Sequence, residues 1–248
     1  MQALDQSDPY DRYRPFVGHF WPEVQRYEEA ARIPPHAKAA WIARVKKSHR
    51  GIARFSALEG LRGEAVDQDF LEEICELEKL EYLDLGWPTT AKDFGPLARL
   101  QRLRFLKIDS PRNITDFSPL LQLPRLESLF IENAKHLSTL DWLEPLASQL
   151  KVLGVEGSMH TDQKIESLAP LRGFNLDALY LVSARIADQD LTPLHGMTNL
   201  CYLRTALNAP RAQFEALHAA LPDLQCNWFD PASWKGFRDP PKPRAKKG

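Results

Sequence analysis

The chain has 248 residues and a formal net charge of −1, and 44% of its side chains are apolar. Its three cysteines are too few for a disulfide framework, and no stretch approaches the roughly 18 apolar residues of a membrane span. Residues 1–11 are polar and contain no apolar run of the kind that directs export. We therefore expect a cytoplasmic protein with reduced thiols and no membrane partner.

Charge is unevenly distributed along the chain. Residues 1–50 carry a net charge of +3 and residues 235–248 carry +5, whereas residues 51–234 carry −9. A body that binds nucleic acid needs a cationic surface to neutralise phosphates. The acidic middle of the chain therefore argues against a nucleic-acid partner.

Residues 1–51 are expected to form an N-terminal helical cap. One helix is predicted over residues 22–33, where it begins at a proline. A second is predicted over residues 37–48, because Trp41 and Val45 are four residues apart and make an apolar stripe. Such a cap would cover the first coil of a solenoid. The functional alternative for this region is a basic contact patch, made of Arg44, Lys46, Lys47 and Arg50.

After a strand expected over residues 52–61, a Pro-Leu dipeptide with an apolar residue two positions before the proline recurs five times. Its prolines are 23, 26, 25 and 23 residues apart, at Pro96, Pro119, Pro145, Pro170 and Pro193. Similarity at this period indicates a stack of identical supersecondary units. Because proline is tolerated in the first turn of a helix, each dipeptide predicts a short helix or 3₁₀ turn, with Ser118 and Thr192 as N-caps.

A second repeating pattern, Leu-x-x-Leu-x-(Leu/Ile/Val), lies between the Pro-Leu turns. Its last two apolar residues alternate with their neighbours, as in a short strand with one buried face. The pattern recurs at Leu80-Leu83-Leu85, Leu103-Leu106-Ile108, Leu126-Leu129-Ile131, Leu150-Leu153-Val155, Leu176-Leu179-Leu181, Leu200-Leu203-Thr205 and Leu221-Leu224-Cys226. Each unit is therefore predicted to be a strand, a turn and a short helical segment.

These repeats resemble the leucine-rich repeat family, in particular the bacterial internalin-like subtype. Two segments, residues 114–120 and 186–194, come nearest to the Ile-x-Asp-φ-x-Pro-Leu pattern of that subtype. The resemblance covers residues 52–229, or about seven to eight coils. It implies an α/β solenoid: a horseshoe with a parallel β-sheet on its concave face and short helices or 3₁₀ turns on its convex face.

The C-terminal end, residues 230–248, is expected to close the core and then to continue as a disordered tail. Four aromatic residues follow the last repeat: Trp228, Phe229, Trp234 and Phe237. The tail over residues 238–248 is rich in proline and lysine, a composition typical of disorder. A docking motif in this tail is an alternative to a purely solvated end.

Catalytic, metal and cofactor motifs are not found in the sequence. There is no Gly-rich phosphate loop, no G-x-S-x-G and no H-E-x-x-H, and the cysteines form no C-x-x-C. We therefore expect no enzyme activity, no cofactor and no metal. The rival hypothesis is an enzyme whose site lies in an irregular turn, for which Ser158 and His160 are the candidates.

The candidate site is the concave face, onto which the residues flanking each buried strand pair are expected to project. Five aromatic residues are predicted to lie there in water, and aromatic residues with arginine are typical interface anchors. They are Tyr82, Phe105, Phe130, Tyr180 and Tyr202. Arg204, Lys107 and Asp84 complete the central contacts of this face. Ordinary cross-strand pairing is the alternative explanation for the aromatic residues.

Three carboxylates, on Asp109, Glu132 and Glu156, fall at the same position in consecutive repeats. Because strands are about 4.8 Å apart, they predict a row of like charge that a cationic partner would relieve. Screening by water at the strand ends is the alternative.

From these features we expect a monomeric, non-enzymatic module that binds a partner protein of basic character. Its role would be that of an adaptor or an inhibitor. One form of inhibitor is an immunity protein that neutralises a cognate toxin. The acidic concave face is the reason for this hypothesis.

Overall fold

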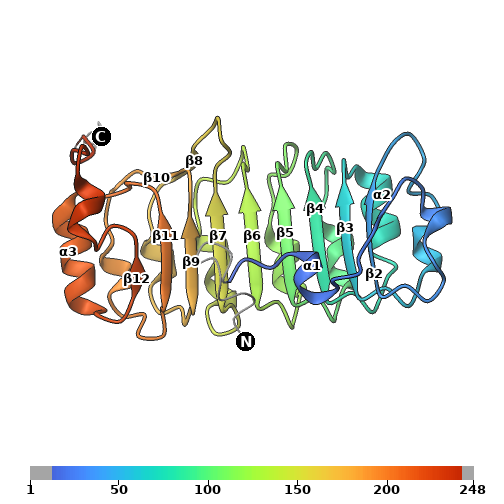
Figure 1. The fold of residues 1–248 in the computed structure, drawn as a ribbon, viewed down its shortest axis with the longest axis horizontal. Helices are drawn as coiled ribbons and strands as arrows, with labels where there is room; N and C mark the ends of the chain where they lie inside the picture. The colour runs from blue at the N-terminus through green and yellow to red at the C-terminus, as the bar shows by residue number, and fades with distance from the viewer. Residues whose placement is uncertain (1–12, 242–248) are drawn as a thin grey trace. The chain divides into compact units, whose positions relative to one another are not determined.

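The computed structural model describes residues 13–241. These residues divide into two compact units, with the boundary between His136 and Leu137. In the first unit, six parallel strands follow one another in chain order (Figure 1). They are β1 (Arg26–Tyr27), β2 (Ala39–Ala43), β3 (Gly60–Glu64), β4 (Tyr82–Gly86), β5 (Phe105–Asp109) and β6 (Ser128–Glu132). Helix α1 (Val17–Phe20) precedes them and α2 (Gln68–Ile74) follows β3.

The second unit repeats the same construction. Strands β7 (Val152–Glu156), β9 (Ala178–Leu181), β11 (Tyr202–Thr205) and β12 (Gln225–Cys226) are parallel neighbours. A separate two-stranded parallel sheet joins β8 (Gln163–Ile165) to β10 (Ala184–Ile186). Helix α3 (Arg211–Ala220) connects β11 to β12.

Each unit is built from the predicted repeat of strand, turn and 3₁₀ helix. All five Pro-Leu dipeptides lie in 3₁₀ helices: Gly95–Arg99, Ser118–Gln122, Asp141–Leu146, Ala169–Leu171 and Thr192–Leu194. Further 3₁₀ helices are Ala30–Arg32, Ile52–Arg54 and Pro231–Trp234. The leucine triplets point into the core between strands and 3₁₀ helices, where Leu83, Leu106, Leu129, Leu153 and Leu179 have no exposed surface. The predicted repeat solenoid is thereby confirmed.

The caps of the 3₁₀ helices differ from the prediction. The N-caps are Phe117 and Leu191, which make no side-chain cap hydrogen bond, while Ser118 and Thr192 are the first residues of their helices. Instead, the carboxylates of Asp116 and Asp190, two residues earlier, accept the backbone N–H groups of these residues at 2.8 and 2.9 Å. In both turns, an aspartate thus accepts the N–H of the first helical residue, which has no carbonyl partner within the helix.

The two helices predicted over residues 22–33 and 37–48 are wrong. These residues instead contain β1, which pairs with β2, and β2, which pairs with β3. Ala40 and Ile42 are buried with no exposed surface, whereas Trp41 between them is only half-buried. This alternation has the period of a strand, and pairing with β3 decides between it and the four-residue helical spacing.

The predicted positions of two strands also need correction. The strand expected over residues 52–61 begins only at Gly60, after a 3₁₀ helix. The last strand is shifted by two residues, because Leu203 pairs with Cys226 and not with Leu224. Helix α3 precedes this short strand and replaces the 3₁₀ turn of the other repeats, so the regular spacing does not extend to it.

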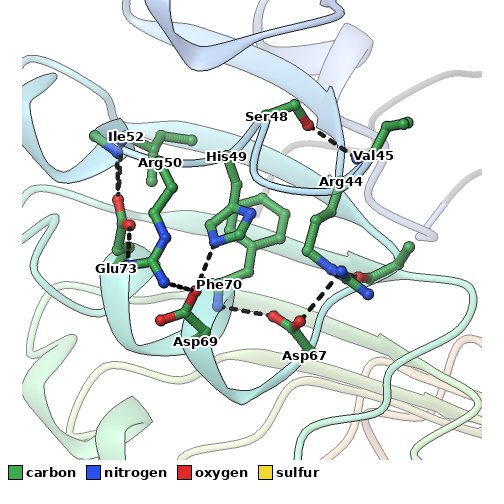
Figure 2. A network of polar contacts seen from close by, with 12 residues as sticks. Arg44, Val45, Ser48, His49, Arg50, Ile52, Asp67, Asp69, Phe70 and Glu73 are labelled. Atoms are coloured by element: carbon green, nitrogen blue, oxygen red, sulfur yellow. Dashed lines mark hydrogen bonds and ion pairs between the residues drawn. The ribbon is translucent and has the colours of Figure 1, made fainter.

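A polar network ties the turn after β2 to helix α2 (Figure 2). Arg44 forms an ion pair with Asp67 at 3.2 Å, and Arg50 forms one with Asp69 at 2.5 Å. Asp67 also caps α2 by accepting the N–H of Phe70 at 3.0 Å. Two of the four residues of the predicted basic patch are therefore engaged within the chain.

The C-terminal aromatic residues form a cluster over the last strands. The Trp228 indole donates a hydrogen bond to the carbonyl of Thr205 at 3.0 Å, and its ring lies 5.1 Å from that of Trp234 and 6.0 Å from that of Phe214. Trp228 is buried, whereas Phe237 is 57% exposed. Most of the tail predicted over residues 238–248, like residues 1–12, lies outside the described part of the chain.

Candidate functional site

The concave face is the side of the sheet opposite the 3₁₀ helices, and in the first unit its residues align as predicted. The register pairs Tyr82 with Phe105, and Asp84 with Lys107. It also pairs Lys107 with Phe130, and Asp109 with Glu132. Side chains from consecutive strands therefore form rows across the face.

The aromatic residues of these rows are buried, which contradicts the prediction that they lie in water. Tyr82 is 1% exposed, Phe105 is 4% exposed and Phe130 has no exposed surface. Strand alternation does keep them out of the leucine core. A second layer, supplied by the beginning of the chain, covers them from the other side.

This layer is the N-terminal segment, residues 13–25, which runs across the concave face of the first unit. In Figure 1 it is the blue segment that contains α1 and passes in front of β4, β5 and β6. The Phe20 ring lies 4.8 Å from the Phe105 ring and 5.7 Å from the Tyr82 ring, and the Trp21 ring lies 6.2 Å from the latter. Val17 completes this apolar cluster and has no exposed surface.

Arg14, at the other end of the segment, binds the row of carboxylates for which the sequence predicts a cationic partner. Its guanidinium donates to Oε1 of Glu132 at 2.7 Å and lies 4.9 Å from the centre of the Phe130 ring. Lys107 reaches the same carboxylate at 3.1 Å. The chain itself therefore supplies some of the positive charge that a partner was expected to bring to these carboxylates.

The pKa values of three carboxyl groups on this face, those of Asp84, Asp109 and Glu132, are shifted in different directions. Burial raises the pKa of Asp84, although Lys107 and Arg62 act against it. Burial likewise raises the pKa of Asp109, and neighbouring Glu132 adds to the rise. For Glu132 burial acts upward too, but the positive charges of Lys107 and Arg14 outweigh it and lower the pKa. The ion pair with Arg14 therefore favours the ionised carboxylate.

Asp84 is a charged group of the face that is almost fully enclosed, with 2% of its surface exposed. Its Oδ2 accepts an ion pair from Arg62 at 3.2 Å. Within residues 13–241, neither Oδ1 of Asp84 nor Nε of Arg62 has a hydrogen-bond partner. Such unpaired buried atoms cost free energy, so this point of the face favours a ligand that supplies a donor.

In the second unit, the predicted site residues occupy the corresponding strand positions. Arg204 pairs in register with Tyr180, and Tyr202 with Ala178. The rings of Tyr180 and Tyr202 lie 5.4 Å apart and are buried, which again corrects their predicted exposure. Glu156 ends β7 and is 2% exposed, whereas Arg204 is half-buried.

The rival enzyme site is not supported by its geometry. The Ser158 hydroxyl accepts the backbone N–H groups of His160 and Thr161, at 3.2 and 3.0 Å, and so stabilises a turn. His160 is exposed, and the Ser158 contacts are those of a local cap rather than of an activated nucleophile. Across residues 13–241, no cluster of His, Cys, Asp or Glu has the make-up of a metal site. No helix in this range is both long and apolar enough to cross a bilayer.

The N-terminal segment is the part of the site that sequence reasoning missed. It lacks the repeat pattern and was assigned to a cap at the end of the solenoid. A signal was nevertheless present, since Phe16, Val17, Phe20 and Trp21 place four bulky apolar residues in a stretch of six. In a segment without a core of its own, such residues need a surface to cover.

The parallel strands, the 3₁₀ helices and the leucine core define the fold: the chain has a leucine-rich repeat fold. No protein-family model matches the sequence, and neither does any curated protein. Among solved structures, it is similar to an internalin (inlF) from Listeria monocytogenes, with a TM-score of 0.57 and 26% identity over 75% of this chain and 52% of that one. The chain therefore spans about half the length of that internalin structure.

Two other similar structures are more distant. Internalin C2 from the same organism matches with a TM-score of 0.45 and 22% identity, over 76% of this chain and 71% of that one. A leucine-rich repeat protein from Leptospira interrogans matches with a TM-score of 0.48 and 17% identity, over 82% of this chain and 57% of that one.

Proposed function

We propose that this protein is a non-enzymatic module that binds a partner protein through the concave face of its repeats. One observation carries the proposal: the face of β2–β6 already holds a protein segment, residues 13–25, through ring contacts and the Arg14–Glu132 ion pair. A surface that binds a segment of its own chain in this way has the chemistry to bind a segment of another.

The proposed contacts are the strand residues that face this layer or occupy the same positions in the second unit. They are Tyr82, Asp84, Phe105, Lys107, Asp109, Phe130, Glu132, Glu156, Tyr180, Tyr202 and Arg204. The proposed partner is basic, because carboxylates exceed cations among these residues and Glu132 already accepts a guanidinium. The interaction would act either to connect the partner to another protein or to inhibit it.

The test is affinity purification from the source organism with a triple variant, Lys107→Ala, Asp109→Ala and Arg204→Ala. These side chains are half-buried, so their loss should leave the leucine core intact. The matched control removes the same kinds of charge from exposed turns, with Lys79→Ala, Glu78→Ala and Arg125→Ala. A partner retained by the wild type and the control but lost by the triple variant supports the proposal. If the triple variant retains every partner, the concave face is not the binding surface.

An immunity protein is the narrower form of this proposal. The net charge of −9 over residues 51–234 favours it, because a basic nuclease toxin would be attracted to an acidic body. Addition of the purified protein to the captured partner decides the role. Loss of the partner's enzyme activity identifies an inhibitor, and unchanged activity identifies an adaptor.

A further inference from the structure

The N-terminal segment covers the surface to which the partner is assigned. We propose that residues 13–25 are an exchangeable occupant of this surface, and that the partner displaces them with a segment of the same chemistry. That segment carries an arginine and, six to seven residues later, a bulky aromatic pair, as Arg14, Phe20 and Trp21 do. This inference rests on the proposed function and adds to it both the kind of partner and its regulation.

The way in which the segment is held resembles a bound ligand more than a structural element of the sheet. Strand pairing begins only at Arg26, which pairs with Trp41. Before that point, the contacts with the face are made chiefly by side chains, namely the Arg14 ion pair and the rings of Phe20 and Trp21. The ladder reaches the segment at its last residue, where the N–H of Trp41 donates to the carbonyl of Gln25 at 3.1 Å. Displacement of residues 13–24 would leave this bond in place.

The segment also leaves part of the face unused. The buried Oδ1 of Asp84 and Nε of Arg62 have no hydrogen-bond partner within residues 13–241. Phe16 is 40% exposed, although it lies beside residues that are buried against the face. A partner segment that places a donor at Asp84 would gain a hydrogen bond that the N-terminal segment does not make. This gain gives the partner an advantage in the competition.

Gly60 provides a way to loosen the segment without touching the leucine core. A methyl group added at Gly60, in β3, would overlap the six-membered ring of Trp21. Gly60→Ala should therefore push Trp21 away from the face. Gly196→Ala is the matched control, because no atom lies within 4 Å of the added methyl group.

The experiment measures binding of a labelled peptide, with the sequence of residues 13–25, to the full-length wild type and to each variant. Apparent affinity scales with the fraction of molecules whose site is open. We expect Trp21→Ala, which loosens the segment and leaves the face unchanged, to bind the peptide about tenfold more tightly than the wild type. Trp87→Ala removes a tryptophan that is 60% exposed and should match the wild type. Gly60→Ala should gain no such affinity, because its added methyl group also meets the tryptophan of the peptide. A peptide with alanine in place of its arginine and its Phe-Trp pair should not bind. Hydrogen exchange over residues 13–25 should be faster in Gly60→Ala.

A second variant guards against misfolding of the first. Trp21→Ala leaves every strand residue unchanged, and should also accelerate exchange in the segment and tighten peptide binding. The proposal is overturned if exchange is unchanged in both variants, since the segment is then a permanent part of the fold. It is equally overturned if exchange rises in Trp21→Ala but the peptide binds this variant no more tightly than the wild type.

Failure of this inference is distinguishable from failure of the proposed function. A captured partner that depends on Lys107, Asp109 and Arg204, but binds Trp21→Ala no better and is not displaced by the peptide, would uphold the function and refute the exchange. Competition between peptide and partner, together with tighter partner binding by Trp21→Ala, supports both.

Discussion

Glu132 is the residue at which the concave face and the N-terminal segment are joined electrostatically. Its carboxylate lies 2.7 Å from Arg14 and 3.1 Å from Lys107, and its pKa in the folded chain is below its ordinary value of 4.5. A carboxyl group with a lowered pKa stabilises the folded state fully above its ordinary pKa. This stabilisation is lost as the pH falls through the lowered pKa.

Acidification below about pH 4.5 should therefore loosen the N-terminal segment. Hydrogen exchange over residues 13–25, corrected for intrinsic rates, should rise in the wild type as Glu132 takes up a proton. Glu132→Gln should raise exchange already at pH 7 and remove this part of the pH dependence. Asp84 and Asp109 act in the opposite direction, because their raised pKa values favour the folded state as the pH falls. The difference between wild type and variant isolates Glu132, and identical pH profiles would contradict its role.

The cysteines offer a second residue-scale prediction. Burial raises the thiol pKa of Cys75 and of Cys226 to about 12, whereas Cys201 is exposed. At pH 8 only about one in ten thousand of these two thiols is ionised, and the thiolate is the reactive form. Brief iodoacetamide treatment followed by mass spectrometry should find Cys201 modified first, and all three only after unfolding. Equal modification of Cys226 and Cys201 in the native protein would refute this order.

At the scale of elements, β6 shows how one strand can be buried on both faces. Leu129 and Ile131 point into the leucine core, while Phe130 points to the concave face beneath Arg14. None of the three has more than 1% of its surface exposed. Both faces of this strand therefore contribute to the stability of the fold, not only the face that the leucine pattern marks.

Substitutions in β6 should reflect this double burial. Leu129→Ala should lower the free energy of unfolding by about 2–5 kcal/mol, and Phe130→Ala by about 3–5 kcal/mol. Trp87→Ala is the control for an aromatic residue that is 60% exposed, and should cost less than about 1 kcal/mol. Urea denaturation measures all three. A cost for Phe130→Ala as small as that of Trp87→Ala would place the Phe130 ring in water.

At the scale of the whole molecule, a repeat protein is stabilised within each coil and between neighbouring coils. In the second unit, Leu179 of β9 lies between β7 and β11, and pairs in register with Leu153 and Leu203. Local destabilisation in such a stack should spread to adjacent repeats before it reaches distant ones.

Leu179→Ala should therefore accelerate hydrogen exchange most in β9 and next in β7 and β11. Exchange in β3 and β4 of the first unit should change least, because those strands share no rung with β9. Mass spectrometry of exchanged peptides resolves these segments. A uniform increase over both units would show that the molecule unfolds as a single cooperative body.

Local sequence patterns were sufficient to predict the repeats, but they were insufficient to predict the segments at the borders of the repeats. The Pro-Leu spacing and the leucine triplets predicted β4, β5, β6, β7, β9 and β11 with their register. Over β2, however, Trp41 and Val45 fit a helical stripe, while Ala40 and Ile42 fit a strand. Only the presence of β3 as a hydrogen-bonding neighbour resolves this ambiguity, because a short apolar run has no unique period.

Local patterns were enough to predict the repeat, its strands and the rows of side chains on the concave face, since these depend on alternation within a few residues. What lies against those rows became known only from the folded chain. Phe20 meets Phe105 and Arg14 meets Glu132 across 85 and 118 positions of the chain, and no local period encodes such contacts. Burial of the concave face is therefore a property of the folded chain, because it requires apolar and charged groups from distant segments to satisfy one another.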